Sequence, residues 1–195
     1  MILLTGFEPF LGETVNPSKE LLGFYFSALD IHTLSLPVSY QKSFLVLKEK
    51  LSHQSYDHII MLGQAGGRTS VSLERVALNW MDSEFSDEEG QVFCETKILD
   101  QGREAHFSSY PLREWYRLAR QENLPIQISN SAGAFVCNSL SYQVGQHIAD
   151  MQMKTKWLFV HVPFLPEQGE KKNEPSMELI QMKTCLDFIL SQVRA

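Results

Sequence analysis

The sequence predicts an α/β fold, in which helices cover both faces of a largely parallel sheet. Two observations predict this class: continuously apolar runs of strand length recur along the chain, and they alternate with longer segments whose apolar residues follow helical spacing. No internal repeat, low-complexity tract or Pro/Ser-rich linker interrupts the alternation. Because the chain has 195 residues and is 44% hydrophobic, we expect one domain over residues 1–195 with a sizeable core.

The first half of the chain is expected to run strand, helix, strand, helix, strand. The segments are residues 1–5, 16–28, 31–38, 44–51 and 58–62, in that order. The first and last of these strands are apolar runs closed by Gly6 and Gly63, as in strands that are buried on both faces. Asn16 followed by Pro17 has the form of an N-cap and a first helical residue, so it marks the start of the first helix.

The second half is expected to continue this order. Helices are predicted near residues 112–119, 137–151 and 179–193, and strands at 126–129 and 157–162. Each helix is predicted from apolar residues on one face, such as Leu112, Trp115 and Ala119 after Pro111. In a sheet of this kind, the loops that leave the carboxyl ends of the strands are expected to form the binding site.

Composition and charge exclude several partners. The 17 Lys and Arg residues are outnumbered by 23 Asp and Glu residues, the formal net charge is −6, and no basic tract is present, so we expect no nucleic-acid partner. The longest apolar runs are far shorter than the roughly 20 residues of a membrane span, so no membrane is expected either. No basic segment followed by an apolar stretch marks a secretory signal, which predicts a cytoplasmic protein.

Metal ions and cofactors are not expected. Cys94, Cys137 and Cys185 are odd in number and far apart, unlike a disulfide framework or a zinc site built from CxxC pairs. The acidic cluster from Asp82 to Glu89 is interpreted as a solvated loop. Residues 63–67 lack the Gly-Lys-Ser/Thr ending of a phosphate loop and the GxGxxG spacing, so no nucleotide is predicted.

Cys137 is the first candidate for chemistry. A short predicted strand runs into small residues and then into a helix whose first turn contains Cys137. The free amides and the positive dipole end of a helix N-terminus favour a thiolate, and they could hold an oxyanion beside the sulfur. The alternative is that Cys137 only packs as a small apolar residue in line with Leu140 and Val144. Cys94 and Cys185 have weaker claims and are expected to be bystanders.

His161 is the second candidate, because it interrupts the strongly apolar run of the last predicted strand just before Pro163. A histidine in a strand is usually a satisfied core residue. A candidate thiol at the end of another strand favours the alternative, a Cys–His pair whose members are distant in sequence and adjacent in the fold.

Glu74 is the third candidate. Residues 71–80 alternate like a strand, but the alternation slips by one at Glu74. Glu74 is in phase with Val76 and Leu78, so its carboxylate is expected to face the interior, where an unpaired charge is costly. Arg75 or another cation is the plain partner. The alternative partner is His161, whose ring a carboxylate would orient and hold in one tautomer.

Four segments, in this order, resemble the pyrrolidone carboxyl peptidase family of cysteine exopeptidases, also called pyroglutamyl peptidase type I. They are Thr5 to Phe10 with Asn16-Pro17-Ser18, Gly63 to Asn79 around Glu74, Ser129 to Asn138 around Cys137, and His161 to Gln168. The resemblance spans most of the chain and implies a three-layer α/β/α sandwich around a mixed, largely parallel twisted sheet. It also implies no cofactor, no metal, a cytoplasmic location and a homo-oligomer, a tetramer or a dimer.

The resemblance further implies a catalytic triad of Glu74, Cys137 and His161 that removes the N-terminal pyroglutamyl (5-oxoprolyl) residue from peptides. Cys137 would attack the carbonyl carbon, and His161 would take the thiol proton and return it to the leaving amine, which leaves a thioester. Water activated by His161 would then release pyroglutamate, while Glu74 holds the imidazole ring. The expected partners are therefore N-terminally pyroglutamylated peptides.

A pocket for this small, flat, uncharged lactam needs apolar walls and few polar contacts. The resemblance implies that the residues that bind the lactam or shape its pocket are Phe7, Phe10, Asn16, Gln64, Phe85, Phe135 and Val136. Phe7 and Phe10 lie in a loop marked by Gly and Pro after the first strand, where aromatic side chains favour a ligand role.

Two departures from the family pattern bear on activity. Where the family shows a run of the type Asp-Asp-Ala-Arg-Ile, Glu84 replaces the arginine that lies near the reactive sulfur, and Leu11-Gly12 replaces a Gly-Gly pair. A carboxylate near the sulfur would oppose thiolate formation, and Arg68 or Arg103 could compensate. Glu84 therefore leaves two alternatives open: a pyroglutamate-binding paralogue with weak or no turnover, and a cysteine amidase with a different substrate.

Overall fold

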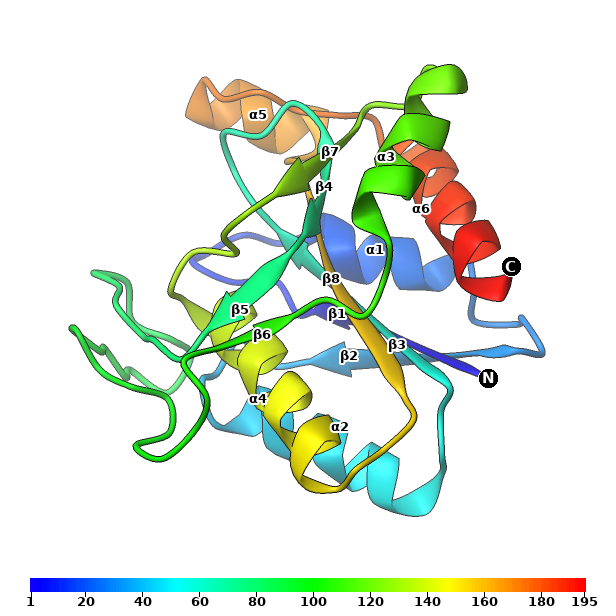
Figure 1. Ribbon diagram of the computed structural model, residues 1–195. Helices are drawn as coiled ribbons and strands as arrows, with labels where there is room; N and C mark the ends of the chain where they lie inside the picture. Colours follow the sequence, from blue (N-terminus) through cyan, green and yellow to red (C-terminus); the bar gives the residue numbers. More distant parts are fainter.

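A six-stranded mixed sheet organises the computed structural model, which describes residues 1–195 (Figure 1). Its strands follow the spatial order β2-β1-β3-β8-β4-β7. They are β1 (Ile2–Phe7), β2 (Ile31–Leu36), β3 (His58–Gln64), β4 (Val71–Glu74), β7 (Ile126–Ser129) and β8 (Lys156–Val162). All neighbouring pairs are parallel except β4 and β8, which are antiparallel. The predicted largely parallel sheet is therefore confirmed.

Helices cover both faces of the sheet, which confirms the three-layer sandwich (Figure 1). One face packs against α1 (Pro17–Gly23), α3 (Leu112–Gln121) and α6 (Leu179–Arg194), and the other against α2 (Lys42–His53) and α4 (Val136–Asp150). Successive side chains of β8 alternate between these layers. Val160 belongs to the first core and Phe159 to the second, so His161 faces the α4 side of the sheet.

The chain leaves the main sheet at Arg75, so the prediction of one regular strand over residues 71–80 is wrong. β5 (Val76–Leu78) pairs instead with β6 (Ala105–Phe107) in a separate antiparallel ribbon. The side chain of Asn138 on α4 holds this ribbon, because it bonds to the backbone N–H and C=O of Leu78 at 2.9 Å each. As a result Ala77 is buried and Leu78 is 39% exposed, whereas the sequence predicted that Leu78 faces the interior.

Three other local predictions also differ from the structure. The first helix ends at Gly23 rather than near residue 28, because the chain turns there and the N–H of Phe24 bonds back to the carbonyls of Leu21 and Leu22. β2 ends before Pro37, which has no N–H to give to a sheet. The proline-punctuated loop after β8 contains a further helix, α5 (Pro166–Lys172), which begins with proline at its first position.

The acidic loop is only partly solvated as predicted. Glu84 and Glu88 are exposed, but Asp87 is buried and accepts hydrogen bonds from the backbone N–H groups of Tyr40, Glu89 and Gln91. Asp87 thus folds the loop rather than binding solvent. No group of three or more His, Cys, Asp or Glu side chains is arranged to hold a metal ion, and no helix is long and apolar enough to cross a membrane.

Candidate active site

Three neighbouring strands and one helix bring the candidate residues together. β3, β8 and β4 are adjacent, and their register sets Gly63 beside His161 and His161 beside Ser72. Glu74 lies two residues beyond Ser72 and therefore on the same face of β4. Cys137 is the second residue of α4, the helix that covers this face. Residues 63, 74, 137 and 161 thus meet on one side of the sheet.

Glu74 is the centre of a buried charge cluster. Nδ1 of His161 lies 2.8 Å from Oε1 of Glu74, and Nη1 of Arg68 lies 2.8 Å from the same oxygen. The Glu74 side chain is only 2% exposed, and its Oε2 has no hydrogen-bond partner in the protein. Of the partners considered from the sequence, Glu74 takes His161 and the cation Arg68. Arg75 turns away and donates from Nη1 to Oδ1 of Asn130 at 2.7 Å.

The bond to Glu74 defines the state of the His161 ring. A carboxylate accepts, so Nδ1 carries the proton and Nε2 keeps a free lone pair. Burial lowers the pKa of His161, and the hydrogen bond to Glu74 and its charge oppose this shift. The imidazole is therefore neutral at pH 7 and able to accept a proton at Nε2.

The thiol of Cys137 is protonated at rest, which corrects the expectation that the helix N-terminus makes it ionise readily. Burial and, second to it, the charge of Glu74 raise the pKa of Cys137 to about 12, although Arg68 and a backbone hydrogen bond oppose the shift. Removal of the sulfur from water outweighs the helix dipole. The resting pair is therefore a neutral thiol and a neutral imidazole.

Gly63 provides the space that the sulfur occupies. A β carbon placed on Gly63 would lie 2.9 Å from Sγ of Cys137 and 2.7 Å from Cζ of Phe159. The sulfur thus lies directly over the strand residue that pairs with His161. No side chain caps the N-terminus of α4, so its first-turn N–H groups are free to act as donors beside Cys137.

A cavity of about 300 Å³ opens beside Cys137. Every residue predicted for the lactam pocket lines it, namely Phe7, Phe10, Asn16, Gln64, Phe85, Phe135 and Val136. The rings of Phe10 and Phe135 lie 5.5 Å apart and form one wall. Phe85 is 59% exposed and stands at the mouth of the cavity. Most of the lining is hydrophobic, as an uncharged ligand requires.

Asn16 and Gln64 differ in what they can offer a ligand. Oδ1 of Asn16 accepts from the N–H of Ser18, and Nδ2 donates to the carbonyl of Glu8, so this side chain is used to cap α1 and to shape the loop. Oε1 of Gln64 accepts from Nε2 of Gln168 at 3.0 Å. That bond leaves the amide nitrogen of Gln64 as the group able to face the cavity.

Comparison with known proteins identifies the family. The family model of pyroglutamyl peptidase (Peptidase_C15) matches residues 1–193. The chain belongs to the pyroglutamyl peptidase family. It is 40% identical over 197 residues to the pyrrolidone-carboxylate peptidase of Thermosipho melanesiensis. This match covers 98% of this chain and 97% of the relative. Pyrrolidone-carboxylate peptidase 1 of Caldanaerobacter subterraneus is 38% identical, with 98% and 97% covered.

Solved structures of the pyroglutamyl peptidase family share the fold. The pyrrolidone carboxyl peptidase of Fervidobacterium islandicum AW-1 superimposes with a TM-score of 0.93 at 38% identity, covering 99% of this chain and 97% of that one. Pyroglutamyl peptidase I of Bacillus amyloliquefaciens gives a TM-score of 0.91 at 35% identity, with 96% and 91% covered.

The two departures from the pattern of the pyroglutamyl peptidase family lie at the edge of the site. Glu84 is exposed in the loop that also carries Phe85. Of the two arginines that could compensate, Arg68 lies within the site, whereas Arg103 is exposed and its N–H bonds to Gln146. Leu11 lines the cavity with a φ of 55°, a left-handed conformation that glycine adopts with less strain.

Sequence reasoning missed two residues of this pyroglutamyl peptidase site. Gly63 was interpreted only as the end of a strand, and nothing local shows that a sulfur lies above it. Gln168 is 2% exposed; besides Gln64, its Nε2 contacts the carbonyl of Val15, and its Oε1 accepts from the N–H of Leu165. The available signal was an uncharged polar side chain in the His161 to Gln168 segment.

Proposed function

We propose that this chain is a pyroglutamyl peptidase that removes the N-terminal pyroglutamyl residue from peptides, with Cys137 as nucleophile, His161 as general base and Glu74 as the group that orients the base. The observation that carries the proposal is the 2.8 Å contact between Nδ1 of His161 and the buried carboxylate of Glu74, on the sheet face against which the Cys137 sulfur packs. Family membership of residues 1–193 supports the same activity.

Acylation starts from the neutral pair. As Sγ of Cys137 bonds to the carbonyl carbon, its proton moves to Nε2 of His161 and the carbonyl π electrons move onto oxygen. The free N–H groups at the start of α4 stabilise this oxyanion. When the tetrahedral intermediate collapses, the C–N bond breaks, the amine leaves with the proton held by His161, and a thioester to Cys137 remains.

Deacylation follows the same chemical steps, with water as the nucleophile. His161 takes a proton from the water, the hydroxide oxygen bonds to the thioester carbon, and the C–S bond breaks. The sulfur regains the proton from His161, and pyroglutamic acid is released. The imidazolium that forms in each half-reaction is paired with Glu74 at 2.8 Å, which stabilises it where water is excluded.

Arg68 lets this arrangement operate in a buried site. Without a cation, an ionised Glu74 would oppose any negative charge that develops on Cys137. The guanidinium of Arg68, 2.8 Å from the same oxygen that binds His161, offsets that charge and lowers the pKa of the thiol. Arg68 thus supplies positive charge near the sulfur in a chain where Glu84 replaces the arginine of the family pattern.

Recognition of the lactam follows from the walls of the cavity and one oriented amide. Phe10 and Phe135 present apolar ring surfaces to the flat five-membered ring. The amide nitrogen of Gln64 donates to the ring carbonyl, because Gln168 occupies its oxygen. A prolyl residue lacks that carbonyl and leaves the donor unpaired, which costs binding.

A paired reporter assay tests the proposal and its alternatives. Wild type is expected to cleave a pyroglutamyl amide and not a prolyl or glutaminyl amide, and Cys137→Ala is expected to cleave none. Cys94→Ala, which removes an exposed thiol, is the matched control and should keep full activity. Equal activity of wild type and Cys137→Ala would reject the nucleophile. Equal or better cleavage of the prolyl or glutaminyl amide would favour an amidase, and lactam binding without cleavage would favour the paralogue.

The remaining proposals concern the state of the protein. We propose that residues 1–195 act as one catalytic domain, that the protein is cytoplasmic, and that it forms a homodimer or homotetramer. Its three free cysteines suit a reducing compartment. Sedimentation equilibrium of the full chain under reducing conditions tests the oligomer, and a purely monomeric protein at micromolar concentration would contradict it.

A further inference from the structure

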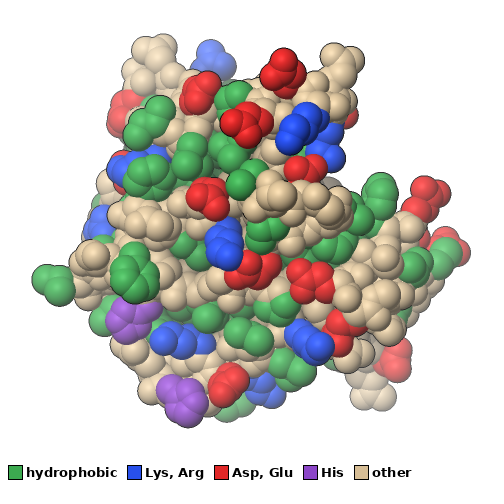
Figure 2. Space-filling model, turned by 180° about the vertical axis from the view of Figure 1, so that it is seen from behind, with side chains coloured by type: hydrophobic (Ala, Val, Ile, Leu, Met, Phe, Trp, Pro, Cys, Tyr) green, Lys and Arg blue, Asp and Glu red, His purple; other side chains and the backbone are tan.

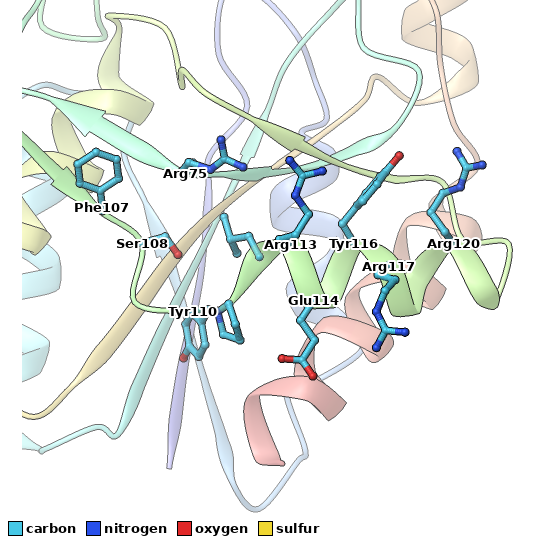
Figure 3. Close-up of a pocket in the computed structure, with 11 residues that line it drawn as sticks. Arg75, Phe107, Ser108, Tyr110, Arg113, Glu114, Tyr116, Arg117 and Arg120 are labelled. Carbon is cyan, nitrogen blue, oxygen red and sulfur yellow. The ribbon is translucent and has the colours of Figure 1, made fainter.

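A second, larger hollow lies along α3 and shares no residue with the cavity beside Cys137. Its volume is about 1070 Å³, and four of the seven arginines of the chain line it: Arg75, Arg113, Arg117 and Arg120. Figure 3 shows Arg75, Arg113, Tyr116 and Arg120 pointing to one side of α3, while Glu114 and Arg117 point to the other. We call the first set the arginine row.

The charges of the arginine row are not balanced within the protein. Arg68 and Arg194 each pair with a carboxylate, but no arginine of the row has one within 4.0 Å. The chain has more carboxylates than cations, with a net charge of −6, so a shortage of acidic residues does not explain why the arginine row lacks partners. On the face seen from behind, Lys and Arg side chains lie among Asp and Glu (Figure 2). The unpaired row therefore favours an anionic ligand.

The row is extended and does not converge on one point. Arg113, Tyr116 and Arg120 are three and four residues apart on α3, which places them along about 10 Å of helix. Arg75, the residue after β4, continues the row beyond the start of α3 (Figure 3). A site for a single phosphate would instead gather its donors around one centre. The spacing suits several negative charges arranged in a line.

The row also borders an open edge of the sheet. A third hollow, of about 360 Å³, shares Arg75, Arg113 and Tyr116 with the hollow along α3 and extends over Gln127 and Ile128 of β7. β7 is the last strand of the sheet. The carbonyls of Pro125, just before β7, and of Ser129 accept from the N–H groups of Val71 and Arg75, so by alternation the backbone groups of Ile128 face away from β4. An extended peptide could pair with this edge.

We propose that the arginine row and the edge of β7 form a docking site for an extended acidic peptide segment of a partner protein. The segment lies along β7 with backbone hydrogen bonds to Ile128, and its Asp or Glu side chains, at alternate positions about 7 Å apart, reach Arg75 and Arg113. A nucleic acid fits less well, because the row stands on a protein of net charge −6 with no wider basic surface.

Fluorescence anisotropy of a peptide labelled at its N-terminus, fluorescein-Asp-Val-Glu-Val-Asp-Val-amide, tests the site on the full-length protein. Saturable binding is expected, and Arg75→Gln and Arg113→Gln should each weaken it by about fivefold or more. Arg103→Gln is the matched control, since it removes the same charge from an exposed arginine outside both hollows. Its affinity should stay within about twofold of wild type. Unchanged circular dichroism in the variants separates loss of binding from loss of fold.

Three results with the wild-type peptide and other anions would overturn the proposal, and a fourth, with a proline-substituted peptide, would overturn its pairing with β7. One is the absence of saturable binding up to 1 mM peptide. Another is an equal loss of affinity in Arg103→Gln, which would mean that only net charge matters. The third is tighter binding of inorganic tripolyphosphate or of a short single-stranded oligonucleotide, with the same dependence on Arg113, which would identify a general polyanion site. A peptide with the valines replaced by prolines should bind more weakly, and equal affinity would contradict pairing with β7.

Discussion

Replacing Gly63 with alanine is expected to displace the nucleophile. The added methyl group would lie 2.9 Å from Sγ of Cys137 and 2.7 Å from Cζ of Phe159. Contacts of this kind are normally about 3.5–4.0 Å, so the sulfur must move by about 0.6–1.1 Å, or the strand must shift by a similar amount. The φ angle of Gly63 is not positive, so alanine suits the backbone and the effect comes from the contact alone.

Two magnitudes follow from that displacement. Overpacking of a filled core costs about 1–3 kcal/mol, which lowers Tm by roughly 2–12 °C for a chain of this size. A displacement of about 1 Å at the reacting atom lowers kcat by about 100-fold. Because Gly63 does not line the cavity, KM for a pyroglutamyl reporter should change only a few-fold. The predicted signature is a large fall in kcat with a nearly constant KM in a folded protein.

Steady-state kinetics and thermal unfolding of Gly63→Ala test this reasoning. Gly23→Ala is the control, because a β carbon there meets nothing within 4 Å and the residue lies in α1. That variant should keep full activity and gain about 0.5–1 kcal/mol of stability. A folded Gly63→Ala protein with kcat within threefold of wild type would refute the proposed position of the sulfur.

Four further predictions use other parts of the site. Glu74→Gln should lower kcat by about 10²–10⁴-fold and move the acid limb of kcat/KM to lower pH, because Glu74 holds the pKa of His161 up; an unmoved limb would contradict this. Gln168→Met should raise KM about tenfold with a smaller change in kcat, since Gln64 loses its orientation, and unchanged KM would show that Gln168 has only a structural role. The pKa of His161 is lowered in the folded state, so the unfolded chain binds its proton first, and His161 makes the free energy of unfolding fall as pH drops below about 6.5; in urea titrations, His161→Gln should lack this component. With a pKa of about 12, Cys137 should be alkylated by iodoacetamide at a rate that rises tenfold per pH unit from 7 to 10, whereas a plateau near neutral pH would mean a preformed thiolate.

Local sequence predicted most of the fold. The runs that became β3 and β8 are apolar over most of their length because both faces of the central strands are covered, and that pattern needs no knowledge of partners. α3 was predicted from its apolar face. The errors lie where a distant group decides the backbone. Asn138 of α4 fixes the phase of β5, so alternation along residues 71–80 could not show which side chains are buried.

The candidate site also combines features that the sequence predicted with contacts that only the tertiary structure decided. Residue type and neighbourhood singled out Cys137, His161 and Glu74, because each is unusual in its segment: a thiol at a helix start, an imidazole in an apolar strand and a carboxylate in a strand whose residues are all buried. The choice of Arg68 rather than Arg75 as the cation beside Glu74 depended on two tertiary contacts: Arg68, between β3 and β4, reaches the Glu74 carboxylate, and Arg75 bonds to Asn130 instead.

By itself, the amino-acid order determined the alternation of strands and helices, the family and the chemical groups available for a reaction, since these depend on periodicity and on residue types at fixed spacing. Only the tertiary structure decided which groups touch, and with them the protonation of the thiol, the orientation of Gln64 and the unpaired arginines along α3. Burial and Coulomb interactions act between atoms brought close by packing, over separations in sequence such as residues 74 and 161, and no local pattern encodes those distances.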